Sequence, residues 1–266
     1  MRTKDHPIGI IDSGSGGFSV WAAITKRLPH ESTLYIGDHA HLPYSEKSTQ
    51  YIRNRICAIL RYVRANRVKL AVIACNTATV AGIDVYRKKF PDMPIIGVVP
   101  VIKSAVAETE TKHFIVLSTV YTANSTYQKN LIDTYAKGYT VYNIGCPNLV
   151  RAIEEGIISG TGVRQELLQV LTPLLNRPVD IIALGCTHYP FVADEIRAIV
   201  GKKVRILDSG GAVARHVERV LTNNKNLASK NIDGRHEFRT TGDPKKVHNT
   251  MKILLGKSYP INYAEI

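Results

Sequence analysis

The chain has 266 residues, of which 44% are hydrophobic, and it carries a formal net charge of +13. This length suffices for one large domain or two modest ones. Because no apolar stretch reaches the roughly 20 residues of a membrane span and no signal-peptide core follows the first residues, we expect a soluble, cytoplasmic protein.

Short apolar runs alternate along the chain with longer stretches of mixed polarity, which is typical of βα units around a parallel sheet. The predicted strands are 8–11, 34–36, 70–73 and 95–98 in a first set, and 114–117, 141–144, 181–184 and 204–207 in a second. Apolar residues at helical spacing predict helices over 46–66 and 163–175. We therefore predict an α/β fold of two lobes.

A short repeat indicates how the lobes are connected. The segment Ile-Ile-Asp-Ser-Gly at 10–14 is echoed by Ile-Leu-Asp-Ser-Gly at 206–210, where a second strand-to-helix turn is expected. This places the return to the first lobe near Ser209 and predicts one domain of 1–98 plus 210–266 and another of 99–209. The polar segment after Lys225 gives no clear pattern of elements.

The first predicted strand leads into a glycine-rich turn, Asp12-Ser13-Gly14-Ser15-Gly16-Gly17. Such a turn lets backbone amides approach an anion at a helix N-terminus. It has neither the spacing of a dinucleotide fingerprint nor the GK[ST] of a P-loop. A plain tight turn explains this segment equally well.

Two histidines in Gly37-Asp38-His39-Ala40-His41 raise the question of a metal site, because side chains two apart on an extended segment point the same way. No third ligand is evident, so a polar loop is favoured and no metal is expected. Pro43-Tyr44-Ser45 follows with turn chemistry and a phenol that can line a cleft.

The four cysteines, Cys57, Cys75, Cys146 and Cys186, form no CxxC pair and are interpreted as free thiols. Two of them end predicted strands and are followed by polar residues, in Cys75-Asn76-Thr77 and Cys186-Thr187-His188. Ligands in open α/β sheets collect where strands end. Two opposed thiols can remove a proton from one face of a carbon and deliver one to the other, which inverts a stereocentre. The pattern therefore indicates a racemase.

The neighbours of these two thiols suit that chemistry. Asn76, Thr77 and Thr187 can donate hydrogen bonds to a carboxylate, and His188 can exchange protons near neutral pH. Cys57 lies on a predicted helix and is interpreted as a buried core residue. Cys146, before Pro147, is compatible with either a core or a supporting role.

With these residues assembled, the sequence resembles the glutamate racemases of the cofactor-independent aspartate/glutamate racemase superfamily. The similar motifs run along nearly the whole chain: Asp12-Ser13, Gly37-Asp38 with Pro43-Tyr44, Cys75-Asn76-Thr77, Cys146-Pro147 with Glu154-Glu155-Gly156, and Cys186-Thr187-His188-Tyr189-Pro190. The resemblance implies two pseudo-symmetric α/β domains with mainly parallel sheets flanked by helices, an active site in the interdomain cleft, and neither metal nor cofactor.

The resemblance also implies roles for individual residues. Cys75 takes the α-proton from D-glutamate and Cys186 takes it from L-glutamate, while Asp12 assists the first thiol and His188 the second. The implied substrate-contacting positions are Asp12, Ser13, Tyr44, Ser45, Asn76, Thr77, Thr119, Thr122, Thr187 and His188. The product D-glutamate would serve peptidoglycan synthesis.

The chain departs from the family pattern at two positions. Ser45 replaces the glycine that usually follows Pro-Tyr, which adds a side chain where backbone can approach the ligand. Ser15 stands where an apolar residue is usual. Neither change removes a proposed catalytic group.

Other functions stay open at this stage. A related enzyme acting on aspartate, hydantoin or a malonate is the nearest alternative, although His188 after Cys-Thr favours the glutamate branch. The positive charge raises the local concentration of anionic small molecules and of nucleic acid, but the basic residues are scattered, so a nucleic-acid partner is not favoured. A binding role, such as the DNA gyrase binding of some glutamate racemases, and a homodimer are also open.

Overall fold

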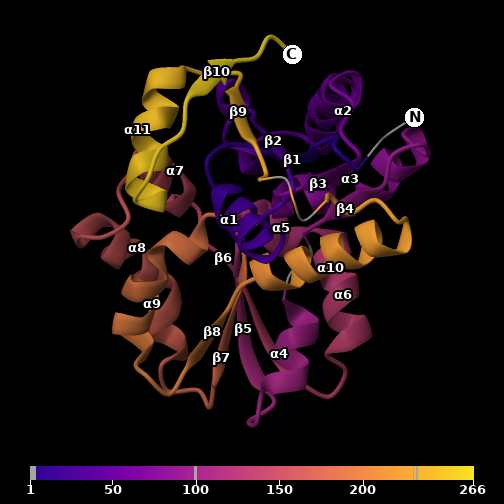
Figure 1. The fold of residues 1–266 in the computed structure, drawn as a ribbon. Helices are drawn as coiled ribbons and strands as arrows, with labels where there is room; N and C mark the ends of the chain where they lie inside the picture. The colour runs from indigo at the N-terminus through magenta and orange to yellow at the C-terminus, as the bar shows by residue number, and fades with distance from the viewer. Residues whose placement is uncertain (1–3, 99–100, 230, 232) are drawn as a thin grey trace. The chain divides into compact units, whose positions relative to one another are not determined.

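The computed structural model describes residues 4–98, 101–229, 231 and 233–266. The chain divides into two compact units, Met1–Val98 with Gly210–Ile266, and Val99–Ser209, each with its own parallel sheet (Figure 1). The predicted α/β fold with parallel sheets flanked by helices is confirmed. Within the described ranges, no helix is both long and apolar enough to cross a lipid bilayer.

The first unit holds a six-stranded parallel sheet in the order β10-β9-β2-β1-β3-β4. Its strands are β1 (Ile8–Asp12), β2 (Thr33–Gly37), β3 (Leu70–Ile73), β4 (Ile95–Gly97), β9 (His236–Thr240) and β10 (Ile261–Tyr263). Every residue of β1 to β4 is buried, which explains why these strands read as continuous apolar runs.

The helices of the first unit are α1 (Phe18–Arg27), α2 (Thr49–Ala65), α3 (Asn76–Lys89), α10 (Gly210–Asn223) and α11 (Pro244–Leu255), with 3-10 turns η1 (His39–His41) and η2 (Tyr44–Glu46). Helix α1 packs against α10, and α2 against α3. The helix predicted over 46–66 begins later, at Thr49, because the Ser48 side chain accepts a hydrogen bond from the Tyr51 amide and caps it.

The polar segment after Lys225, which the sequence left unassigned, adds two strands to the first sheet. Strand β9 pairs with β2, and β10 with β9, so segments far apart in the chain lie side by side (Figure 1). Only Phe238 in β9 is both apolar and buried. Hydrophobic periodicity is weak in so short and polar a strand, so the sequence did not predict it. Its pairing with β2 defines it as a strand.

The second unit holds a four-stranded parallel sheet in the order β6-β5-β7-β8. Its strands are β5 (His113–Ser118), β6 (Thr140–Gly145), β7 (Ile181–Gly185) and β8 (Arg205–Leu207). Its helices are α4 (Ile102–Glu108), α5 (Val120–Asn124), α6 (Thr126–Tyr135), α7 (Leu149–Glu154), α8 (Thr161–Leu171) and α9 (Ala193–Val200), with 3-10 turns η3 (Thr172–Leu174) and η4 (Tyr189–Val192). The helix predicted over 163–175 ends at Leu171, because Pro173 cannot continue it.

The two sheets share a topological feature that positions the candidate residues. In the first sheet β1 lies between β2 and β3, and in the second β5 lies between β6 and β7. Each arrangement creates a switch point at the carboxyl ends of neighbouring strands, where ligands of open α/β sheets bind. Asp12 and Cys75 stand at the ends of β1 and β3, and Thr119 and Cys186 at the ends of β5 and β7.

Candidate active site

Cys75 is buried at the end of β3 and caps helix α3. Its sulfur accepts a hydrogen bond from the Ala78 amide at 3.4 Å, and its carbonyl accepts the first helical bond from the Thr79 amide. The Ser13 hydroxyl lies 3.5 Å from the sulfur. A helix N-terminus stabilises negative charge, and an amide and a hydroxyl can donate to a thiolate. The site therefore surrounds Cys75 with neutral donors.

The glycine-rich turn brings Asp12 and Ser13 beside β3. Asp12 is fully buried, and its carboxylate accepts a hydrogen bond from the Gly14 amide at 2.8 Å. The turn is tight enough to require glycine at position 17, because a Cβ there would lie 2.7 Å from the Cβ of Asp12 and 2.8 Å from the Tyr35 hydroxyl. The glycines in this turn thus serve close packing around a buried carboxylate.

Asn76 follows Cys75 and is buried, with 2% of its surface exposed. Among the described residues, neither the amide nitrogen nor the amide oxygen of its side chain has a hydrogen-bond partner. A buried amide without partners costs about 1–3 kcal/mol, so native proteins seldom leave one unless a ligand completes it. Thr77, also buried, comes next in α3. Asn76 is the clearest sign of a polar ligand in the first unit.

Asp38 is a buried carboxylate at the end of β2 that fixes the loop carrying Tyr44. It accepts hydrogen bonds from the Tyr44 hydroxyl at 2.6 Å, from Arg55 at 2.7 Å and from the Thr241 hydroxyl at 2.9 Å. Burial by itself raises the pKa of Asp38, but hydrogen bonds from Arg55 and Tyr44 outweigh it, so the pKa is lowered. Asp38 is therefore ionised and acts as an anchor.

The phenol of Tyr44 stays protonated. Burial, followed by the charge of Asp38, raises its pKa well above the ordinary value, and Cys75 is near enough to raise it further when charged. Its hydroxyl is committed to Asp38. Ser45 is half-buried in the same 3-10 turn.

The two histidines considered for a metal are engaged elsewhere in the first unit. His39 lies 3.0 Å from the buried Ser15 hydroxyl through one ring nitrogen and 2.8 Å from the Thr240 hydroxyl through the other. His41 contacts Asp38 at 2.9 Å. His39 is therefore a polar partner for the buried Ser15 hydroxyl.

Cys186 ends β7 and is paired with a buried histidine and carboxylate. Its sulfur lies 3.7 Å from Nδ1 of His188, whose Nε2 lies 2.6 Å from the carboxylate of Glu154. Burial by itself lowers the pKa of His188, but hydrogen bonds to Cys186 and Glu154 outweigh it and raise the pKa well above 6.5. At neutral pH His188 is an imidazolium that can donate a proton toward the sulfur.

The remaining candidates of the second unit lie at the ends of the same strands. Thr119 caps α5, and its hydroxyl donates to that of Thr122 at 3.0 Å. Thr187, between Cys186 and His188, is buried. The Thr119 and Thr122 hydroxyls are therefore held by each other at the switch point of this sheet.

Two other cysteines are core residues. Cys57 is buried in α2. Cys146 donates to the carboxylate of Glu166 at 3.4 Å, and burial together with the charge of Glu166 raises its pKa. The Cys146 thiol is therefore protonated and unreactive.

Two functional carboxylates were missed or misinterpreted from the sequence. Glu154 received no role, although it stands four residues after Val150 on the buried stripe of α7, a spacing that predicts burial. Asp38 was cited only within the histidine segment and the Gly37-Asp38 motif, without a role of its own. Two of its partners, Arg55 and Thr241, are 17 and 203 positions away, and no local pattern connects them to it.

Comparison with known proteins identifies close relatives. Residues 8–217 match the family model described as Asp/Glu/Hydantoin racemase. The chain is 40% identical over 261 residues to a glutamate racemase of Pseudomonas putida (strain W619), covering 97% of both chains. A glutamate racemase isoform from Bacillus anthracis superposes with a TM-score of 0.91 at 29% identity, covering 99% of this chain and 98% of that one. The glutamate racemase from Francisella tularensis, solved with D-glutamate, gives 0.87 at 27% identity, with the same coverage.

Proposed function

The chain belongs to the Asp/Glu/Hydantoin racemase family, and we propose that it interconverts L- and D-glutamate by proton transfer at the α-carbon between the thiols of Cys75 and Cys186. The observation that carries the proposal is that each unit places a buried cysteine at the switch point of its sheet, beside groups suited to handling a proton.

The chemistry sets what the site must supply. Removing the α-proton of an amino acid leaves a carbanion next to a carboxylate, so the enzyme must stabilise developing charge with fixed donors and exclude water. Buried hydrogen-bond donors meet the first requirement. Asn76, with its unpartnered amide, together with Thr77 and Thr187 would bind the carboxylates of glutamate.

The two thiols act in opposite directions. In the direction from D to L, the Cys75 thiolate takes the α-proton and the Cys186 thiol delivers one to the other face; the reverse direction exchanges these roles. Asp12 would hold the turn that carries Ser13 next to Cys75. His188, held by Glu154, would return a proton to Cys186.

The proposed reaction uses neither a metal ion nor an organic cofactor. Two solved relatives were crystallised with glutamate, one with D-glutamate and one, from Escherichia coli, with L-glutamate and the activator UDP-MurNAc-ala. We place the enzyme in the bacterial cytoplasm, where it would supply D-glutamate for peptidoglycan. A homodimer fits this role but is not required by it.

Incubation with L-glutamate in deuterated water, in the presence of a chelator and without added cofactor, tests the proposal. We expect D-glutamate that carries deuterium at the α-carbon, detected by mass spectrometry after chiral separation. A parallel incubation with L-aspartate tests the nearest alternative. Aspartate racemised faster than glutamate, or no exchange with either, would contradict the assignment.

A further inference from the structure

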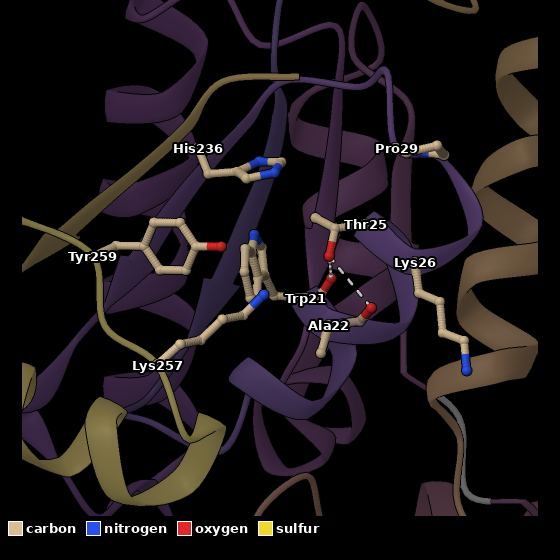
Figure 2. Close-up of a pocket in the computed structure, with 8 residues that line it drawn as sticks. All are labelled: Trp21, Ala22, Thr25, Lys26, Pro29, His236, Lys257 and Tyr259. Atoms are coloured by element: carbon tan, nitrogen blue, oxygen red, sulfur yellow. Dashed lines mark hydrogen bonds between the residues drawn. The ribbon is translucent and has the colours of Figure 1, made fainter. Parts of the chain in front are cut away.

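A pocket in the first unit combines aromatic and basic side chains (Figure 2). Its volume is about 280 Å³, and it is lined by Trp21, Ala22, Thr25, Lys26, Pro29, His236, Lys257 and Tyr259. His236 is the first residue of β9 and stands in register with Thr33, the first residue of β2. Because the strands are parallel, this is the amino end of the sheet, whereas Asp12 and Cys75 follow its carboxyl ends.

Aromatic rings build one side of this pocket. Trp21 is 99% buried, and its ring meets those of His236 and Tyr259 edge to face, with centroids 5.3 and 5.4 Å apart. Figure 2 shows the Tyr259 phenol pointing toward Trp21. Trp21 thus holds Tyr259 in place, and the half-buried Tyr259 ring is the aromatic surface of the pocket against which a flat ring can pack.

A chain of hydrogen bonds orients His236. The Trp21 indole N–H donates to the Thr33 hydroxyl at 3.0 Å, and that hydroxyl lies 3.1 Å from Nδ1 of His236. The Thr33 oxygen has a second lone pair, so its contact with Nδ1 is compatible with either tautomer of His236. Burial, with a contribution from Lys257, lowers the pKa of His236, so the ring is neutral at pH 7. His236 is thereby held in place as a neutral polar ring beside the pocket.

The pocket is also positively charged. The Lys257 ammonium lies 5.5 Å from the Trp21 ring centroid and 5.6 Å from that of Tyr259, and it reaches across Trp21 in Figure 2. Lys26 also lines the pocket, although Figure 2 shows its ammonium pointing away from Trp21, and none of the eight lining residues is acidic. An anion is the ligand that the Lys257 ammonium recognises.

From these features we propose that the pocket is an accessory binding site for a small planar organic anion, a ring bearing a carboxylate or phosphate. The ring packs against the half-buried Tyr259, the anion pairs with Lys257, and the His236 ring supplies a further polar contact. The volume equals that of about nine water molecules, which suits a single ring with its anionic group.

The chain supplies its own reporter, because Trp21 is its one tryptophan. Titration of the intact protein with benzoate, followed by Trp21 fluorescence, is expected to give a saturable change. Benzyl alcohol has the ring without the charge, and acetate has the charge without the ring. Each should bind at least tenfold more weakly than benzoate. Phenyl phosphate tests whether phosphate replaces carboxylate, and free N-acetyltryptophanamide corrects for collisional quenching.

Two variants locate the binding. Lys257→Gln removes the ammonium and should weaken benzoate binding about tenfold, while Ala22→Phe fills the pocket and should abolish saturation. Lys252→Gln removes an exposed lysine of α11 that does not line the pocket and should leave binding unchanged. Circular dichroism establishes that each variant is folded.

Three results would overturn the proposal: a change that does not saturate, equal affinity for benzoate and benzyl alcohol, or equal weakening by Lys257→Gln and Lys252→Gln. If Ala22→Phe fails to fold, the comparison of the two lysine variants still decides. Since binding is measured without turnover, the outcome does not depend on the racemase assignment.

Discussion

The sulfur atoms of Cys75 and Cys186 lie beside chemically different groups. Cys75 caps a 14-residue helix and is surrounded by the Ala78 amide and the Ser13 hydroxyl. Cys186 is followed by a 3-10 turn and lies beside His188, which is bonded to Glu154. One sulfur is supported by neutral dipoles and the other by a group that carries a full, exchangeable charge.

This difference indicates that the environments of the two thiols respond to pH through different groups. A helix N-terminus does not titrate, whereas an imidazolium does. Each region also contains a buried carboxylate, but Asp38 anchors the loop of Tyr44 and Glu154 touches the histidine of the thiol. Substitution of each carboxylate separates an anchoring role from a role in proton transfer.

The largest effect is expected from removing either sulfur. Cys75→Ala and Cys186→Ala should each lower kcat for racemisation by about a thousandfold, because each removes the acid or base for one face. Chiral chromatography of the products measures the loss. Cys57→Ala, which removes a buried thiol of α2, is the matched control: it should keep its activity and lose about 1 kcal/mol of unfolding free energy. Full activity in Cys75→Ala would remove that residue from the mechanism.

The next largest effect is expected from Glu154→Gln, which keeps the side-chain shape and removes the charge beside His188. The pKa of His188 should fall, so the alkaline limb of the pH–rate profile should move to lower pH, and kcat should drop roughly tenfold to a hundredfold. Because enantiomers have equal free energies, kcat/KM must fall equally in both directions. The asymmetry should appear in the primary deuterium isotope effect, which should rise more for L-glutamate than for D-glutamate.

An unchanged pH profile in Glu154→Gln, with lower stability only, would assign Glu154 a structural role.

His188 also contributes to stability. Because its folded-state pKa is raised, that contribution is present below about pH 6.5 and is lost as the pH rises through the folded-state pKa. Urea unfolding at several pH values measures it.

Asp38→Asn should act on stability more than on the chemical step. It leaves the guanidinium of Arg55 without its carboxylate and should cost about 3 kcal/mol of unfolding free energy at pH 7. The folded-state pKa of Asp38 is lowered, so the cost should be complete above about pH 4 and should disappear as the pH falls through that lowered pKa. Urea unfolding at pH 7 and at acidic pH tests this, and a difference that persists in acid would contradict it.

The smallest effect is expected from Ser45→Gly, which introduces the glycine that the resemblance leads one to expect after Pro43-Tyr44. Position 45 lies in a 3-10 turn and is not among the positive-φ residues, so its backbone does not require glycine. We expect kcat and KM to change by less than about threefold, with a loss of about 0.5–1 kcal/mol of stability from the added freedom of the unfolded chain. A tenfold fall in KM would show that the Ser45 side chain obstructs the substrate.

The sequence by itself determined the α/β class, eight of the strands, and the cysteines at which two of them end. Six of these strands are almost wholly buried, and a strand buried on both faces must be apolar throughout, so the polar residues that interrupt such a run mark its end. Strands β6 and β8 are more exposed and do not follow this rule. The candidate ligands in 12–13, 75–77 and 186–188 were found for the same reason.

Tertiary structure decided what lies beside those residues. Strand β9 has a single buried apolar residue and is defined by its pairing with β2. The partners of Asp38 come from α2 and from the residue after β9, and Glu154 meets His188 from another helix. Each of these contacts joins side chains that are distant in the chain. Burying a charge costs free energy, and partners that only the folded chain brings close offset that cost. A buried charge therefore leaves no periodic pattern in the sequence.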